Sequence, residues 1–301
     1  MQVTLADGTL ADLSQFDIPT LGRMQFEQEQ AFAQRIKSAP KGSAEREQSI
    51  AQGYDTVCSI LAAMQPPGES LVMGLDPRYE KLVLKILQRR RFLRSGTPRL
   101  FEIGYGCGTL LGRMAAAGFD VAGIEVSPHV RDLAMQQVPK DFQDQLHLGN
   151  FATHPLTGGL DQYDVIYWND VFEHIPTDEL PDFLTRIYKL LLPGGCLITI
   201  TPNWHERPSD VTGDYCLPRT EARGLHLKEY TLRETTALLQ AAGFNHVETP
   251  LAITPWQMLL GLGGLAGVKR TFEPALEYLP FRLAEKMCRV LGIACTMAYK
   301  S

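Results

Sequence analysis

The spacing of apolar residues predicts two helices in the first third of the chain. The first helix has an apolar face made of Ile50, Tyr54, Val57, Leu61 and Met64, and the Pro66–Gly68 run is expected to end it. The second is predicted to begin at Asp76–Pro77, because an aspartate caps a helix well and a proline suits its first position. Its apolar face comprises Tyr79, Leu82, Val83, Ile86 and Leu87. We therefore expect a helical cap over residues 1–95, which either packs beside the core or closes over a ligand as a lid.

The middle of the chain alternates between apolar runs typical of strands and amphipathic stretches typical of helices. Over residues 97–202 this alternation predicts an α/β fold with a doubly wound parallel sheet. Residues 202–230 are rich in polar residues, proline and glycine, which indicates a long loop at the ligand-binding end of the sheet. Thr231 and Glu234 fit a capping box, and Gly243 fits the end of the helix that follows.

The last fifty residues extend this core. Pro255 to Val268 is apolar and glycine-rich, with Gly263 and Gly267 four positions apart, and it predicts a packed helix, a lid or a dimer face. The run is too short and too polar to span a membrane. Leu291 to Lys300 is expected to be a last edge strand. The predicted division is a cap (1–95), a core with its substrate loop (96–254), and an extension (255–301).

Composition narrows the function classes. A net charge of −5 argues against nucleic-acid binding, and the arginine cluster at 89–99 is interpreted as a solvated helix end. The six cysteines have no metal-site or disulfide spacing, which fits reduced thiols. The first residues do not resemble a secretory signal. We expect a soluble, cytoplasmic protein that binds no nucleic acid and does not insert stably into a membrane.

The stretch Leu100 to Leu111 carries the strongest chemical signal. A short strand leads into glycines at 104, 106 and 108, and a helix is predicted from Thr109. Such a turn lets the backbone approach a ligand closely and directs free N–H groups toward it. Thr109 breaks the dinucleotide pattern G-x-G-x-x-G/A, and the acid Glu102 before the turn favours a cationic or amine-bearing ligand. Glu125 ends the next strand, where a carboxylate can accept from two ribose hydroxyls.

These motifs resemble those of class I S-adenosylmethionine (SAM)-dependent methyltransferases of the small-molecule type. The resemblance rests on E-I-G-Y-G-C-G at 102–108 and G-I-E-V-S-P at 123–128, and it continues in V-F-E-H-I-P at 171–176 and L-P-G-G at 192–195. It extends over about residues 97–250. The resemblance implies a Rossmann-like, seven-stranded sheet with SAM as cofactor. The alternative is an ordinary strand–turn–helix with incidental glycines.

The resemblance also implies a role for individual residues. It assigns Glu102, Gly104, Gly106 and Gly108 to the methionine end of SAM, Glu125 to the ribose, Asn150 and Phe151 to the adenine, and Asn169 to the space beneath the methionine. Tyr105 and Val126 are further expected cofactor-binding residues. At position 150 the family usually has an acid, but an asparagine oxygen can accept the same hydrogen bond. Phe151 either stacks on the adenine or fills the core.

His174 is the candidate general base, because an imidazole can take the proton of an oxygen or nitrogen acceptor. It could equally be a helix-start residue bonded to its own backbone. Glu173 is the second candidate catalytic residue and is expected to orient His174. The pair could also bind a divalent metal, but two adjacent ligands do not predict a metal site. Six further residues could contact the acceptor, and the sequence favours none of them: His205, Asp210, Asp214, Tyr215, His226 and Tyr230.

The predicted function is therefore SAM-dependent transfer of a methyl group to an oxygen or nitrogen of a small-molecule acceptor. The alternatives are a protein or lipid methyltransferase and a SAM-binding protein without catalysis. The expected partner is the small-molecule acceptor, with a homodimer possible. Its pocket is expected to be built by the helical cap, the 202–230 loop and the segment after residue 250.

Overall fold

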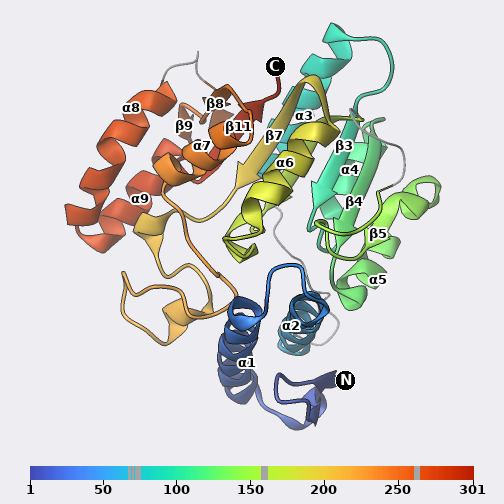
Figure 1. Cartoon of the computed structure of the whole chain (residues 1–301), viewed down its shortest axis with the longest axis vertical. Coiled ribbons are helices and arrows are strands. Elements are labelled where there is room, and N and C mark those ends of the chain that lie inside the picture. Colours follow the sequence, from blue (N-terminus) through green and yellow to red (C-terminus); the bar gives the residue numbers. More distant parts are fainter. Residues whose placement is uncertain (67–68, 70, 72–75, 157–161, 261–264) are drawn as a thin grey trace.

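A seven-stranded sheet forms the centre of the computed structural model, which describes residues 1–66, 69, 71, 76–156, 162–260 and 265–301 (Figure 1). The strand order is β5-β4-β3-β6-β7-β11-β8. Strand β11 runs antiparallel to both of its neighbours, whereas the pairs from β5 to β7 are parallel. The strands are β3 (Arg99–Ile103), β4 (Asp120–Glu125), β5 (Leu146–Leu148), β6 (Tyr163–Asn169), β7 (Leu191–Ile200), β8 (His246–Glu248) and β11 (Cys295–Tyr299). The predicted seven-stranded α/β fold is confirmed.

The last strand does not lie where we predicted it. Strand β11 lies inside the sheet, between β7 and β8, and β8 forms the edge. The physical reason is visible in its side chains, because Cys295, Thr296, Met297 and Ala298 are all buried. A strand buried on both faces and along both edges needs two neighbours, so the expectation of an edge strand was wrong.

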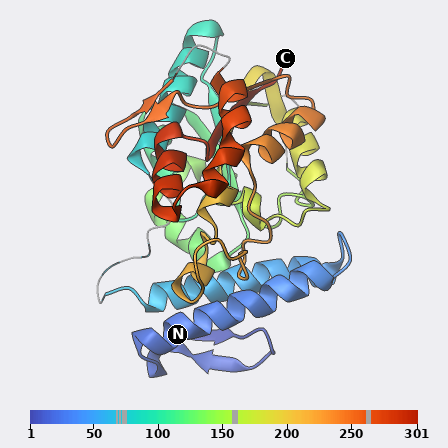
Figure 2. The ribbon, with the colours of Figure 1, turned by 90° about the vertical axis from the view of Figure 1, so that its left-hand side faces the viewer.

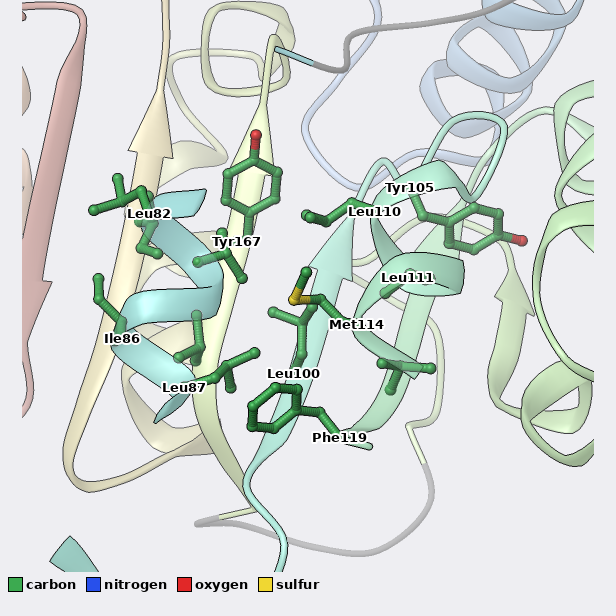
Figure 3. Close-up of a cluster of buried hydrophobic side chains, with 14 of the residues drawn as sticks. Leu82, Ile86, Leu87, Leu100, Tyr105, Leu110, Leu111, Met114, Phe119 and Tyr167 are labelled. Carbon is green, nitrogen blue, oxygen red and sulfur yellow. The ribbon is translucent and has the colours of Figure 1, made fainter. Parts of the chain in front are cut away.

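Helices cover both faces of the sheet. Alternate strand residues point into two separate apolar clusters, so that Leu100 and Tyr167 join one cluster while Phe101 and Trp168 join the other. The first cluster packs against α3 (Pro77–Leu93), α4 (Thr109–Ala116) and α5 (Pro128–Gln137), and the second against α6 (Leu180–Leu190) and α7 (Leu232–Ala241). Figure 3 shows Leu82, Ile86 and Leu87 of α3 packed toward the sheet. Helix α3 therefore belongs to the sheet layers, although the sequence suggested that it was part of the cap.

The cap consists of α1 (Ile18–Ser38), α2 (Ala44–Ala63) and the hairpin of β1 (Gln2–Thr4) and β2 (Leu10–Asp12). The two helices lie side by side below the sheet, with the hairpin on their outer side (Figure 2). Apolar residues of the two helices form two small clusters, one shared with the hairpin and Leu13 and the other with Leu225 and Leu227 of the 202–230 loop. The cap thus packs both within itself and against the core, and α2 also contacts α5.

Between residue 250 and strand β11, the described chain lies beside the sheet at the left of Figure 1. It forms the hairpin of β9 (Ala252–Ile253) and β10 (Met258–Leu259), then α8 (Leu265–Phe272) and α9 (Phe281–Leu291). The predicted apolar segment 255–268 is therefore not one helix, and Gly263 lies outside the described residues. No helix in the described part of the chain has the length and apolar character needed to cross a membrane. Short 3-10 helices occur at Leu13–Gln15, Lys140–Gln145, Phe172–His174, Trp204–Glu206, Val211–Asp214 and Glu273–Tyr278.

Candidate active site

The glycine turn between β3 and α4 has the backbone that only glycines adopt readily. Gly104, Gly106 and Gly108 have φ angles of 68°, 52° and 74°. A Cβ atom on Gly104 would lie 2.6 Å from Cγ2 of Val171, which follows β6. A Cβ on Gly108 would lie 2.8 Å from Cβ of Ala134 in α5. Gly104 therefore keeps the turn close to the end of β6, and Gly108 lets α4 and α5 pack together.

Glu125 at the end of β4 is held by three backbone N–H groups. Gly106 donates to Oε2 at 3.1 Å, while Val126 and Ser127 donate to Oε1 at 2.8 and 3.2 Å. Burial raises the pKa of Glu125, and the three donors oppose that shift. The carboxylate is thus fixed in one orientation directly beside the glycine turn.

Glu102 lies in β3 next to this carboxylate and has no such support. Its side chain is buried, and its Oε2 atom accepts no hydrogen bond. Burial raises the pKa of Glu102 well above its usual value, and the neighbouring Glu125 raises it further. Two acids in one buried place favour a positively charged ligand, because a cation offsets the cost of ionising them.

The predicted cofactor residues surround one cavity. Nine of the ten line it, namely Glu102, Gly104, Tyr105, Gly106, Glu125, Val126, Asn150, Phe151 and Asn169. The tenth, Gly108, is not among the described residues that line the cavity, because it faces α5 instead. The opposite wall comes from α2, through Ile50, Tyr54 and Cys58. The sequence placed Ile50 and Tyr54 only on the apolar face of a cap that could close over a ligand, and it assigned none of the three residues to the site individually.

Asn150 and Phe151 follow β5 at one end of the cavity. Oδ1 of Asn150 accepts a hydrogen bond from the backbone N–H of Ala152 at 2.9 Å, and a second lone pair remains on that oxygen. The ring of Phe151 is only 2% exposed and packs against Phe101 and Phe183, with ring centroids 6.1 and 5.5 Å away. Phe151 is therefore a core residue that also forms part of the cavity wall.

A second cavity, of about 900 Å³, meets the first at Asn169 and Asp170. Asp170 has a φ of 52°, a backbone conformation that is uncommon for residues other than glycine. The walls of this cavity come from the start of α3, residues 200–209, and residues of α9 and its surroundings. Thr201 and Ser209 form part of the wall on the side of the 202–230 loop.

His174 lines the first cavity and is oriented by a backbone carbonyl. Its Nδ1 atom lies 2.8 Å from the carbonyl oxygen of Leu225, which assigns the ring hydrogen to Nδ1 and leaves the lone pair on Nε2. Burial lowers the pKa of His174 to about 3, and the neighbouring His226 contributes to the shift. The imidazole is therefore neutral at physiological pH. We had expected Glu173 to orient it, but the Leu225 carbonyl has that position.

Glu173 points away from the cavity toward Thr201 and His226. Its carboxylate accepts a hydrogen bond from the Thr201 hydroxyl at 2.9 Å, and Nε2 of His226 lies 3.8 Å from its other oxygen. On its other side His226 places Nδ1 3.3 Å from Oε1 of Glu229. Burial raises the pKa of Glu173, whereas the two flanking carboxylates raise the pKa of His226 against the effect of burial.

A comparison with protein families supports the functional reading of this geometry. The model of a family described as a methyltransferase domain matches residues 75–249, which is more than half of the chain. The chain belongs to this methyltransferase family. The prediction of a class I SAM-dependent methyltransferase is thus confirmed at the level of fold and family, with SAM as the cofactor.

Individual relatives of the methyltransferase are distant. An uncharacterized methyltransferase of Bacillus mycoides is 26% identical over 136 residues, which cover 43% of this chain and 59% of the relative. An uncharacterized methyltransferase of Bacillus cereus matches with the same identity and coverage. The chain thus spans about three fifths of the length of these curated relatives.

Two solved structures show the range of similarity. A SAM-bound amino pentose methyltransferase of Micromonospora echinaspora is 25% identical, with a TM-score of 0.33 and coverage of 40% of this chain and 49% of that one. Phosphoethanolamine N-methyltransferase 2 of Haemonchus contortus, in complex with SAM, is 17% identical. Its TM-score is 0.49, and the match covers 87% of this chain and 61% of that one.

Among the loop residues that the sequence could not rank, only His226 joins His174 and Glu173 within the described structure. His205 instead pairs with Glu277, with Nδ1 at 2.9 Å from the carboxylate. Asp210 accepts from the backbone N–H of Thr212 within the loop, and the Tyr215 ring stacks on Phe26 of α1. The only local hint of the role of His226 was an acid three positions later, Glu229.

The cap of the methyltransferase is fastened to the core around the cofactor cavity. Arg46 of α2 donates to Glu179 at 2.8 Å, and Glu179 lines the cavity. Asp55 of α2 accepts from the hydroxyl of Ser127 at 2.9 Å, two residues after Glu125. A third contact joins α1 to the 202–230 loop, through the carboxylate of Glu29 and the backbone N–H of Leu225 at 3.1 Å.

Proposed function

We propose that this chain transfers the methyl group of SAM to an oxygen or nitrogen of a small-molecule acceptor. The observation that carries the proposal is the single cavity lined by nine residues that sequence alone assigned to the cofactor. Family membership supports the cofactor, and the oxygen or nitrogen acceptor is proposed from the family resemblance and from His174, whose Nε2 lone pair can accept a proton.

The charges of the cavity match those of the proposed cofactor. SAM carries a positive sulfonium, and the buried Glu102 has an oxygen without a hydrogen-bond partner. A cation bound there favours the ionised carboxylate and offsets its desolvation. Glu125 is fixed by three N–H donors, so it can accept from the ribose hydroxyls without a change of conformation.

The transferring methyl group of SAM is already electrophilic, so the protein has to align the acceptor and exclude water. Helix α2 closes the cofactor cavity through Ile50 and Tyr54. We propose that the acceptor occupies the second cavity and approaches the methyl group past Asn169 and Asp170, which both cavities share. Its walls include residues of the 202–230 loop and of the chain after 250, as expected for a specificity pocket.

His174 and Glu173 are the proposed catalytic residues. The neutral His174 imidazole offers its Nε2 lone pair as the proton acceptor. Glu173 does not face the cavity, and it holds Thr201 and His226 in place next to His174. With a pKa of about 3, His174 is a weak base. This property suits acceptors whose proton is already acidic, or whose acidity the site increases.

Calorimetry with SAM, S-adenosylhomocysteine and NAD(P)H tests the cofactor. We expect SAM and S-adenosylhomocysteine to bind at one site and NAD(P)H to show no binding. Mass spectrometry of small molecules released from the purified protein then tests for a co-purified acceptor. A chain that binds NAD(P)H and has no affinity for SAM or S-adenosylhomocysteine would overturn the proposal.

A further inference from the structure

Glu173 and His174, which are adjacent in the 3-10 helix Phe172–His174, meet His226 of the 202–230 loop behind the wall of the cofactor cavity. One donor atom each from Glu173, His174 and His226 lies within 4.8 Å of the others. Glu173 and His226 are buried, and His174 also lines the cavity. We propose that these three residues bind a divalent transition-metal ion of the zinc type at the wall of the cofactor cavity, near Asp170, where this cavity meets the second one.

The two histidines are held as metal-binding histidines usually are. Nδ1 of His174 lies 2.8 Å from the carbonyl oxygen of Leu225, and Nδ1 of His226 lies 3.3 Å from the carboxylate of Glu229. A ligating histidine typically donates its second ring N–H to a carbonyl or a carboxylate, which fixes the ring and makes the ligating nitrogen more basic. Both rings thus leave Nε2 as the ligating atom, and on His226, whose pKa the flanking carboxylates raise, the ion would displace a proton from that atom.

Glu173 supplies the independent observation that points to a cation. Its side chain is fully buried, Oε2 accepts from Thr201, and Oε1 accepts no hydrogen bond. Nε2 of His226 is 3.8 Å from Oε1, which is too far for a hydrogen bond. A buried carboxylate oxygen without a partner costs free energy, and an ion between Oε1 and the imidazole nitrogens removes that cost.

The donor set and its dimensions suit a transition metal. Two imidazoles and one carboxylate favour zinc and its neighbours, whereas Mg²⁺ prefers oxygen ligands and retains its water. Donors bound at about 2.1 Å in a tetrahedron lie about 3.4 Å apart, so a separation of at most 4.8 Å closes with side-chain shifts of about 1 Å. Three protein ligands leave a fourth position for a further molecule, as in catalytic rather than structural zinc sites.

An ion here would narrow the proposed acceptors to molecules with a hydroxyl group. Bound beside the ion, the hydroxyl loses its proton to solvent. An oxygen lone pair then forms the new bond to the methyl carbon, and the electrons of the broken C–S bond remain on sulfur, giving S-adenosylhomocysteine. In this state His174 is a ligand and cannot take a proton. This reaction rests on the proposed function, whereas the ion site does not.

A cobalt titration of the untagged, chelator-treated chain tests the site directly. Co²⁺ in a four- or five-coordinate nitrogen and oxygen site gives a visible absorption band, and elemental analysis after zinc loading gives the stoichiometry. We expect the band to saturate at one ion per chain, and we expect His226→Asn and Glu173→Gln to lose it. The matched control is His205→Asn, because His205 is also buried and paired with a glutamate but belongs to no group of metal-ligand side chains in the described part of the chain.

His226 also pairs with Glu229, so its replacement could unfold the loop. His174→Gln, at the cavity wall, provides a second variant, and a melting curve of each variant verifies its fold. A wild-type chain without the band, or a folded His174→Gln variant with an unchanged band, would overturn the metal site. S-adenosylhomocysteine calorimetry on the same samples separates the two proposals: intact nucleoside binding without the ion rejects only the ion, and absent nucleoside binding rejects the proposed cofactor.

Discussion

Nη1 of Arg46 lies 2.8 Å from Oε1 of Glu179, and the two side chains are only 5% and 8% exposed. The same guanidinium atom also donates to Asp178 at 2.8 Å, and its Nε atom donates to the carbonyl of Ala39 at 3.0 Å. This buried ion pair fastens the first turn of α2 to the segment just before α6. Because Glu179 also lines the cofactor cavity, the position of the cap and the shape of the site depend on the same contact.

Replacing Arg46 by methionine should therefore lower the free energy of unfolding far more than replacing a surface arginine does. The variant leaves two carboxylates without their partner, one of them buried, and we expect a loss of about 3–5 kcal/mol in the free energy of unfolding. Arg23→Met is the control, because Arg23 is 68% exposed and its carboxylate partner Glu27 lies 3.9 Å away. Urea unfolding measures both variants. Equal costs for the two replacements would contradict the role of the buried pair.

Gly104→Ala tests the close approach between the glycine turn and the end of β6. Gly42 has nearly the same φ angle, 67° against 68°, but an added Cβ would meet no atom within 4 Å there, whereas at Gly104 it would lie 2.6 Å from Val171. We expect Gly42→Ala to cost about 1 kcal/mol for the backbone alone and Gly104→Ala about 2–4 kcal/mol, with weakened SAM binding.

The double variant Gly104→Ala/Val171→Ala separates the two contributions. The double variant should regain the stability lost through the clash with Val171, whereas the loss due to the strained backbone at position 104 should remain. Thermal unfolding and S-adenosylhomocysteine calorimetry give both readouts. A Gly104→Ala variant as stable as Gly42→Ala would show that the turn adapts freely.

The features that sequence predicted correctly are local ones. Asp76 caps α3 with a proline in its first turn, and Thr231 and Glu234 form the expected capping box, because each signal involves residues within one turn. The position of β11 was wrong for the opposite reason. Its neighbours β7 and β8 are set by pairing with distant segments, and an apolar run of this length does not specify which strands flank it.

The same distinction applies to the site. Glu102, Gly104, Gly106 and Glu125 follow one another within a single strand–helix–strand unit, so the motif and its family resemblance predicted that they share one cavity. The approach of His226 to Glu173 depends on the path of the 202–230 loop, which has no regular period to follow. The cavity wall formed by Tyr54 was hidden as well, because a helix face that lines a ligand has the same apolar spacing as one that packs in a core.

Glu125→Gln should weaken cofactor binding and leave the fold intact. Glutamine keeps an oxygen for the backbone N–H groups but has lost the second acceptor and the charge that the ribose hydroxyls require. We expect the dissociation constant of SAM to rise by about 10- to 100-fold, or about 1–3 kcal/mol. Asp120→Asn, at the opposite end of the same strand, is the control and should bind SAM as the wild type does. Unchanged affinity of the Glu125 variant would place the cofactor elsewhere.

Glu102 should make the free energy of unfolding of the apo protein depend on pH. Bound cofactor should reduce that dependence. Its pKa is raised well above the usual value by burial and by Glu125, so the folded chain holds a proton that the unfolded chain releases at a lower pH. The free energy of unfolding must then fall as the pH rises above about 4.5, through the window that ends at the raised pKa. Glutamine is neutral at every pH, so Glu102→Gln should flatten this part of the profile.

Melting temperatures of the apo protein between pH 5 and pH 8 measure the effect, with Glu27→Gln, an exposed acid, as the control. The cationic cofactor should reverse the balance, because its positive charge stabilises the ionised Glu102. Thus Glu102→Gln should make the apo protein relatively more stable at pH 8 and at the same time weaken SAM binding. These two effects have opposite signs, and a general loss of structure cannot produce both. A variant that keeps the wild-type pH profile and the wild-type affinity would remove Glu102 from the site.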